Sequence, residues 1–176
     1  MSADSTRDLP QASSLPKVRA FVAAVAAGHD GSRREAGVAV GLSERHADYY
    51  GLAATVTLAL VSDEGGRLGV TARGSELLAT EERSFEERAV LRRAITESQS
   101  VTSIAPDLLD ESGPEPEALT QRLLHAGLSA ATARRRASTL LSWRRYVLER
   151  QAQLPMPGGR AAPAIARPRG QRKAAR

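Results

Sequence analysis

Residues 32–71 constrain the fold more than any other part of the chain, because helix caps and turn signals follow one another there at short spacing. Ser32 is a favoured N-cap type, and Gly41 can take the positive φ angle that ends a helix. Ser43 then caps a second helix, which we expect to reach about residue 59. The segment therefore begins with two helices joined by a tight turn.

A β-hairpin signal follows the second helix. The apolar pair at 60–61 begins a strand, and the glycine pair at 65–66 suits a tight reversal. Apolar side chains alternate over 67–70, as they do in a return strand. Thr71 is then placed to cap a further helix over 72–79. The predicted order is helix, turn, helix, hairpin, helix.

This order resembles that of winged helix-turn-helix domains. The segments that carry the resemblance are GLSERHADYYGLAATVTLALV at 41–61 and GGRLGVTARGSELL at 65–78. LALV at 58–61 stands where such domains carry LGLV before the wing, and VTARG at 70–74 stands where they carry LTxxG after it. The chain is similar to winged-helix modules that accompany bacterial restriction and phage-defence proteins. The resemblance implies a DNA-binding winged-helix domain over residues 16–80.

A second helix-turn-helix pattern occurs nearer the C-terminus. The tripeptide GLS that begins at Gly41 returns at Gly127, 86 residues later (127 − 41), and at that offset Val61 aligns with Val147. Helices are predicted on both sides of the second GLS, giving a second unit over 117–151. The match is short, so chance similarity stays open as the alternative, and no hairpin signal follows this unit.

The remaining segments divide the chain around these two units. Polar residues and a proline predict a disordered N-terminus over 1–15. Residues 81–116 are predicted to form a connecting helix over 84–98 and a linker rich in Pro, Gly and acids. Residues 152–176 hold basic residues, prolines and no acid, which predicts a disordered basic tail.

The predicted fold class is therefore mainly α. It consists of tandem helix-turn-helix units, of which the first is a winged helix with a small β-hairpin. Apolar side chains are unevenly spaced in the helix at 84–98, so we expect it to pack on both units or on a second subunit.

Charge is segregated along the sequence. From Arg134 onward there are 12 Lys and Arg against one acid, a balance of +11, while residues 1–133 hold 13 against 19, a balance of −6. A basic end on an acidic body indicates a polyanionic partner. The alternative is composition alone, because 23 of the 25 basic residues are Arg, as an Arg-rich proteome would produce.

Composition also bears on the compartment. The chain has no cysteine, which excludes disulfides and thiolate metal sites and fits a reducing compartment. No apolar run approaches the roughly 18 residues that a membrane span needs. The first 14 residues are polar and include acids, unlike a signal peptide. We therefore expect a cytoplasmic protein with no membrane partner.

No motif predicts catalysis. The three histidines are far apart in sequence, and none has a carboxylate at metal-ligand spacing. The paired acids at 81–82 and 86–87 lie at a predicted helix start, where acids are solvated and favour the helix dipole. No phosphate-binding loop and no serine nucleophile elbow occur. The sequence therefore predicts no enzyme, no catalytic residue, no cofactor and no metal.

The candidate DNA-contacting residues of the first unit lie on its second helix and near its hairpin. The N-terminal end of the recognition helix enters the major groove in such motifs, where an arginine can pair with guanine. Arginines near a wing are suited to phosphate contacts. The acids Glu44 and Asp48 oppose DNA on the same helix. The expected contacts of this unit are Ser43, Arg45, His46, Tyr49, Arg67 and Arg73.

The second unit supplies more positive charge. Its expected contacts are Arg134, Arg135, Arg144 and Arg145. The arginines at 134–136 span about 200° of a helix, so at least one must lie near the packed side. Trp143 is expected in the core rather than as a base-stacking residue.

The function predicted from the sequence is binding of double-stranded DNA, as a transcription regulator or as the DNA-targeting component of a defence system. The alternative is a protein–protein interaction module built on winged-helix scaffolds, in which only the tail touches nucleic acid. A homodimer or protein partner through residues 84–98 is compatible with both.

Overall fold

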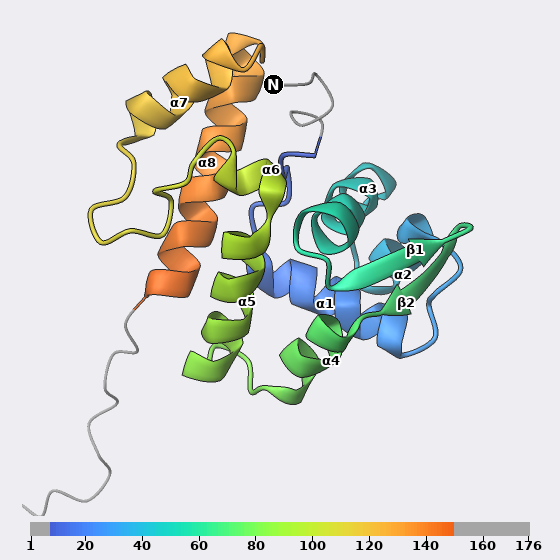
Figure 1. Ribbon diagram of the computed structural model, residues 1–176. Coiled ribbons are helices and arrows are strands. Elements are labelled where there is room, and N and C mark those ends of the chain that lie inside the picture. Colours follow the sequence, from blue (N-terminus) through green and yellow to red (C-terminus); the bar gives the residue numbers. More distant parts are fainter. Residues whose placement is uncertain (1–7, 150–176) are drawn as a thin grey trace, which may run out of the picture.

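A computed structural model describes residues 8–149, so the predicted tail at 152–176 lies outside the described residues. The described part is mainly helical with one antiparallel hairpin, as the sequence predicts (Figure 1). None of its helices is long and apolar enough to cross a membrane. In chain order the elements are α1 (Leu15–Ala26), α2 (Arg33–Ala39), α3 (Glu44–Leu52), the π-helical turn η1 (Ala53–Thr57), β1 (Val61–Glu64), β2 (Arg67–Val70), α4 (Ala72–Ala79), α5 (Phe85–Glu97), α6 (Gln99–Thr102), α7 (Pro116–His125) and α8 (Ala130–Leu148).

The element order predicted for residues 32–71 is confirmed, and local signals account for its boundaries. Ser32 is the N-cap of α2, and its hydroxyl accepts a hydrogen bond from the backbone N–H of Glu35 at 3.1 Å. The hairpin reverses at the glycine pair 65–66, where both φ angles are positive, 64° and 87°. That is the backbone a type I′ turn requires. Thr71 caps α4, again through its hydroxyl.

Helices α2 and α3 approach each other closely at Gly37. A Cβ atom added there would lie 2.2 Å from the Cβ and 2.7 Å from the Cα of Ala47. Neither contact is possible without moving a backbone, so the absent side chain sets the separation of the two helices.

Substituting Gly37→Ala is expected to lower the free energy of unfolding by about 1–3 kcal/mol, because α2 and α3 must separate to admit the methyl group. Urea unfolding followed by the fluorescence of Trp143 measures the change. Gly31→Ala is the matched control. Its added Cβ would meet only the end of the Glu35 side chain, which can move. Equal stability of the two variants would contradict the close crossing.

The turn before α3 and the turn before α8 have the same backbone geometry. Gly41 and Gly127 both take positive φ, 75° and 92°. In each turn the residue after the glycine donates its N–H to the carbonyl five positions earlier, at 3.0 Å in the first and 3.2 Å in the second. Ser43 and Ser129 are then the N-cap residues. The repeated tripeptide therefore corresponds to two helix ends of one kind.

The segment at 8–14 is packed, contrary to the disorder expected over 1–15. Leu9 and Ala12 are buried, and the indole N–H of Trp143 donates to the Ala12 carbonyl at 2.7 Å. Figure 1 shows this segment passing between the first unit and α8. The polar composition predicted disorder because the groups that hold this segment are distant in sequence: the indole of Trp143 and the Thr57 hydroxyl, which donates to the Asp8 carbonyl at 3.0 Å.

A buried polar network joins the first unit to α5 and α8. Arg19 lies 3.5 Å from the carboxylate of Glu87, which also accepts a hydrogen bond from the Tyr146 hydroxyl at 2.6 Å. Arg19 donates further to the carbonyls of Leu77 and Thr80, at 2.6 and 2.7 Å. Burial, with the bond to Glu87, raises the pKa of Tyr146. Helix α5 thus packs between α4 and α8, as its uneven apolar spacing predicts.

Candidate nucleic-acid interface

Helices α3 and α8 border a single cleft of about 370 Å³. It lies between the first unit and the α7–α8 pair, so each of the two GLS turns contributes the helix that follows it. The side chains that line it are Gln11, Arg45, His46, Tyr49, Thr132, Arg135, Arg136 and Thr139. Four of these were predicted as DNA contacts: Arg45, His46, Tyr49 and Arg135.

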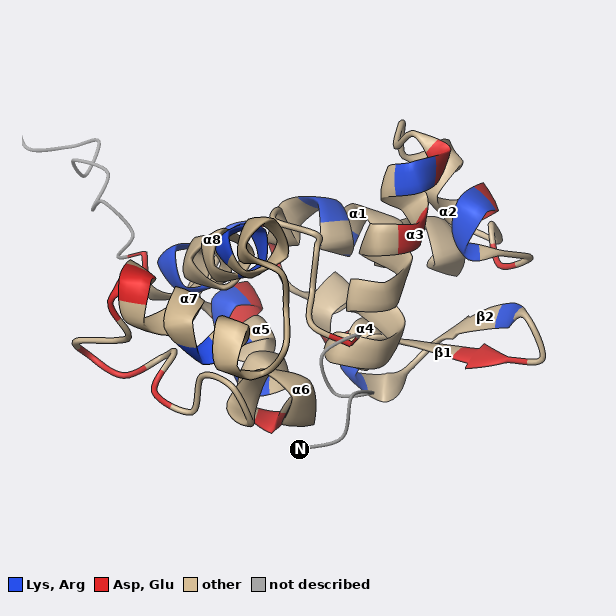
Figure 2. Ribbon diagram, turned by 90° about the horizontal axis from the view of Figure 1, so that it is seen from above, with Lys and Arg blue, Asp and Glu red and all other residues tan. Residues whose placement is uncertain are grey.

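The cleft is a region of positive charge. Its lining holds three arginines and no carboxylate. Within residues 8–149, none of the three lies within salt-bridge distance of an acid. Figure 2 shows basic segments along α8, while acidic segments lie in the loop before α7, on β1 and beside the basic segments of α2 and α3. The positive charge is therefore a property of the cleft lining itself.

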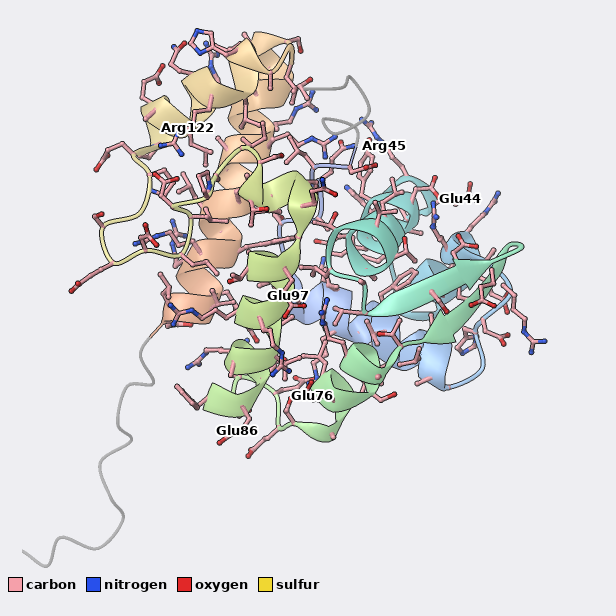
Figure 3. The ribbon with its side chains drawn as sticks, in the orientation of Figure 1. Glu44, Arg45, Glu76, Glu86, Glu97 and Arg122 are labelled. Atoms are coloured by element: carbon pink, nitrogen blue, oxygen red, sulfur yellow. The ribbon has the colours of Figure 1, made fainter. Side chains whose placement is uncertain are left out.

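The acids expected to oppose DNA lie outside this cleft. Glu44 forms an ion pair with Arg34 of α2. Asp48 is exposed and is not among the lining residues. Figure 3 shows Glu44 and Arg45 pointing from the same end of α3 to different sides. The acidic and basic side chains of α3 are thus sorted onto separate faces.

The cleft wall on α3 is ordered by contacts one helical turn apart. The Arg45 Nε–H donates to the Tyr49 hydroxyl at 3.0 Å, and the guanidinium carbon lies 5.8 Å from the centre of the Tyr49 ring. This hydrogen bond raises the pKa of Arg45. The Ser43 hydroxyl lies 2.9 Å from His46 Nδ1 rather than on a backbone N–H of the helix. The exposed side chains of Arg45 and His46 are therefore held in position by contacts with Tyr49 and Ser43, not by burial.

Arg136 is the arginine of the lining that the predicted contacts omit. It is 7% exposed, and its Nε is buried without a hydrogen-bond partner among the described residues. The pKa of Arg136 is lowered to about 10, chiefly by burial and also by the charge of Arg135, while Tyr49 acts in the opposite direction. The sequence does carry a signal for this residue, since one of the arginines at 134–136 had to lie near the packed side.

The arginines predicted near the hairpin are engaged elsewhere. Arg67 begins β2 beside the turn, is largely exposed and pairs with Asp30 at 3.0 Å. Arg73 is about three-quarters buried, donates to the Leu58 carbonyl at 3.2 Å and pairs with Glu97 of α5. The structure therefore gives Arg73 a role in holding α4 against α5.

The other predicted arginines of α8 also lie outside the cleft. Arg144 donates to the carbonyls of Asp110 and Glu111, at 3.1 and 2.9 Å, and so holds the predicted linker against the helix. Arg134 and Arg145 are exposed and line a separate hollow beside α7. Of the predicted arginines of α8, only Arg135 reaches the cleft.

Comparisons of the chain with known proteins find no matching family model, no matching curated protein and no matching solved structure. The candidate site therefore rests on the chemistry of its lining. Guanidinium, phenol and hydroxyl groups offer hydrogen-bond donors suited to anionic oxygens. In the described part of the chain, no three His, Cys, Asp or Glu side chains gather as metal ligands would.

Proposed function

We propose that the protein binds double-stranded DNA through the face that α3 and α8 share, acting as a transcription regulator or as the DNA-targeting component of a defence system. One observation carries the proposal. The helices that follow the two GLS turns place three arginines on one carboxylate-free surface. Arginine-rich surfaces at helix-turn-helix motifs are suited to the DNA backbone and to guanine edges.

The contacts divide by what each side chain can reach. Arg45 lies in the first turn of α3, the part of a recognition helix that meets base edges, and Tyr49 orients its guanidinium. Arg135 is exposed on α8 and suits a phosphate. Arg67, beside the hairpin turn, suits the backbone at the wing. In this arrangement the first unit reads sequence and the second adds affinity.

The alternative function, a protein-interaction module, is favoured by a different surface. Phe85 at the start of α5 is 72% exposed, and it borders a groove with Val147 and Leu148. An exposed aromatic beside apolar neighbours is typical of a protein contact. A homodimer or partner protein through residues 84–98 would cover it.

A fluorescence anisotropy titration of the full chain with duplex DNA separates the two functions. A DNA-binding protein that neutralises several phosphates is expected to lose affinity steeply between about 50 and 200 mM salt. An interaction module is expected to bind the duplex only weakly, and this weak binding is expected to depend on residues 152–176. Absence of salt-sensitive binding in a chain lacking those residues would contradict the proposed function.

Arg45→Ala is expected to cost about 1–3 kcal/mol on a site selected from random duplexes and little on unselected DNA. Arg135→Ala is expected to weaken both alike, because a phosphate contact carries no sequence information. The measurement is the ratio of specific to non-specific affinity. Arg92→Ala, at an exposed position of α5 that does not line the cleft, controls for the lost charge. A ratio that collapses in Arg135→Ala and survives in Arg45→Ala would make α8 the reading helix.

A further inference from the structure

Arg136 is a largely buried cation with no counter-charge among the described residues. The residue is 7% exposed, its buried Nε has no hydrogen-bond partner within residues 8–149, and it lines the cleft. Other arginines with a buried Nε, such as Arg88 and Arg144, donate through another nitrogen to backbone carbonyls. A buried donor without an acceptor, on a residue whose charge is unpaired, costs stability. An anion bound in the cleft would supply both the acceptor and the counter-charge.

The two helix-turn-helix patterns show that the position itself does not require a charge. At the offset of 86 residues, Arg136 corresponds to Tyr50 (136 − 86), which is also 7% exposed and belongs to the core of the first unit. An apolar or aromatic side chain would fill the equivalent place on α8. The second unit instead places a guanidinium at the cleft, where its neighbours include the further cation Arg135.

We infer that the cleft between α3 and α8 contains a phosphate-binding subsite, in which Arg136 is the buried cation and Arg45 and Arg135 are the exposed ones. The inference rests on the proposed function, since it concerns the same face, and it assigns that face a specific ligand group. The lining adds the neutral donors Gln11 and Tyr49. The volume of about 370 Å³ admits a phosphate together with part of the molecule that carries it.

A phosphate fits this set of groups better than a carboxylate. Three guanidinium groups present planar forks of N–H donors, which match the oxygens of a phosphate in bidentate pairs. A phosphate monoester carries a charge of about −1.5 to −2 at neutral pH and can pair with more than one cation, whereas each phosphodiester of a DNA backbone carries a single negative charge. The group can belong to the DNA backbone or to a free phosphate ester, and the two sources predict different effects of phosphate on DNA binding.

The first experiment measures thermal unfolding of the full chain by Trp143 fluorescence, with inorganic phosphate added at an ionic strength held constant with NaCl. Phosphate is expected to raise the melting temperature of the wild type, because a ligand that binds only the folded state stabilises it. In Arg136→Met the affinity for phosphate is expected to fall about tenfold or more, the usual effect of losing a charge-assisted hydrogen-bonding group. The phosphate-free melting temperature of this variant is expected to rise, since a buried N–H donor without an acceptor has been removed.

Arg134→Met is the matched control. It removes the same charge from the same helix, but Arg134 is exposed and lies outside the cleft. This variant is expected to keep the phosphate-induced rise. Loss of the rise in both variants, its retention in Arg136→Met, or its absence in the wild type would each overturn the inference. Should Arg136→Met fail to fold, the double variant Arg45→Ala/Arg135→Ala tests the same subsite and is expected to lose the phosphate effect.

Duplex DNA then distinguishes the two sources of phosphate. If the backbone occupies the subsite, Arg136→Met weakens DNA binding and inorganic phosphate competes with DNA for the wild type. If a free phosphate ester occupies it, Arg136→Met binds DNA as the wild type does in phosphate-free buffer. If phosphate stabilises the protein but DNA does not bind, only the proposed function is contradicted. If DNA binds but phosphate does not stabilise the protein, only this inference is contradicted.

Discussion

Glu87→Leu is expected to cost about 3–5 kcal/mol of the free energy of unfolding, because it removes the buried counter-charge of Arg19 and leaves only the exposed carboxylate of Glu82, 3.7 Å away. Glu87 is 1% exposed, and Arg19 beside it is 8% exposed. The substitution also removes the acceptor of the Tyr146 hydroxyl and of the Arg83 backbone N–H. Urea unfolding followed by Trp143 fluorescence measures the loss.

Two comparisons make this result specific to the network. Glu86→Leu changes the adjacent, exposed acid (Figure 3) and is expected to stay within about 0.5 kcal/mol of the wild type. The double variant Arg19→Met/Glu87→Leu is expected to be more stable than Glu87→Leu alone, since it removes both charges. A loss below about 1 kcal/mol in Glu87→Leu would show that the buried pair does not support the packing of α5.

Trp143→Ala is expected to destabilise the fold by about 3–5 kcal/mol. Trp143 is fully buried, and its indole is also the donor to the Ala12 carbonyl. The variant leaves a large cavity and an unsatisfied carbonyl at the same place. Circular dichroism during urea unfolding measures the effect, because the variant no longer contains tryptophan.

Trp143→Phe separates the two contributions, since it keeps most of the apolar volume and removes only the N–H donor. Its loss is expected to be about 1–3 kcal/mol, the penalty for a buried carbonyl left unpaired. Faster amide exchange confined to residues 8–14 would accompany it. Equal losses for the two variants would mean that the hydrogen bond, rather than packing, dominates at this position.

The helix starts and the hairpin were predictable because their causes are local. The hydroxyls of Ser32 and Thr71 accept hydrogen bonds from N–H groups three residues ahead, and the glycines at 65–66 take the angles that their turn requires. Such signals act within a few residues and do not depend on the remainder of the fold. Trp143 was likewise expected in the core, and it is buried.

The uses of individual arginines were not predictable in the same way. Nothing in the neighbouring sequence distinguishes Arg73 and Arg144 from exposed arginines. In the structure, each donates to a backbone carbonyl of a distant segment. The rotation of α8 decides which of the arginines at 134–136 is buried, and Ala133 and Ala137 fix that rotation by facing the core. The meeting of α3 and α8 at one cleft depends on packing between elements far apart in sequence. No local motif encodes it.

The hydrogen bond between Trp143 and Ala12 also bears on the order of events during synthesis. It joins residues 131 positions apart. The helices and hairpin of residues 15–79 can form from near neighbours as they leave the ribosome, whereas the Ala12 carbonyl waits for the indole of α8. A nascent chain that has not reached α8 therefore lacks the donor that pairs with this carbonyl. Translation of the last described helix completes the hydrogen bonding of the segment at 8–14.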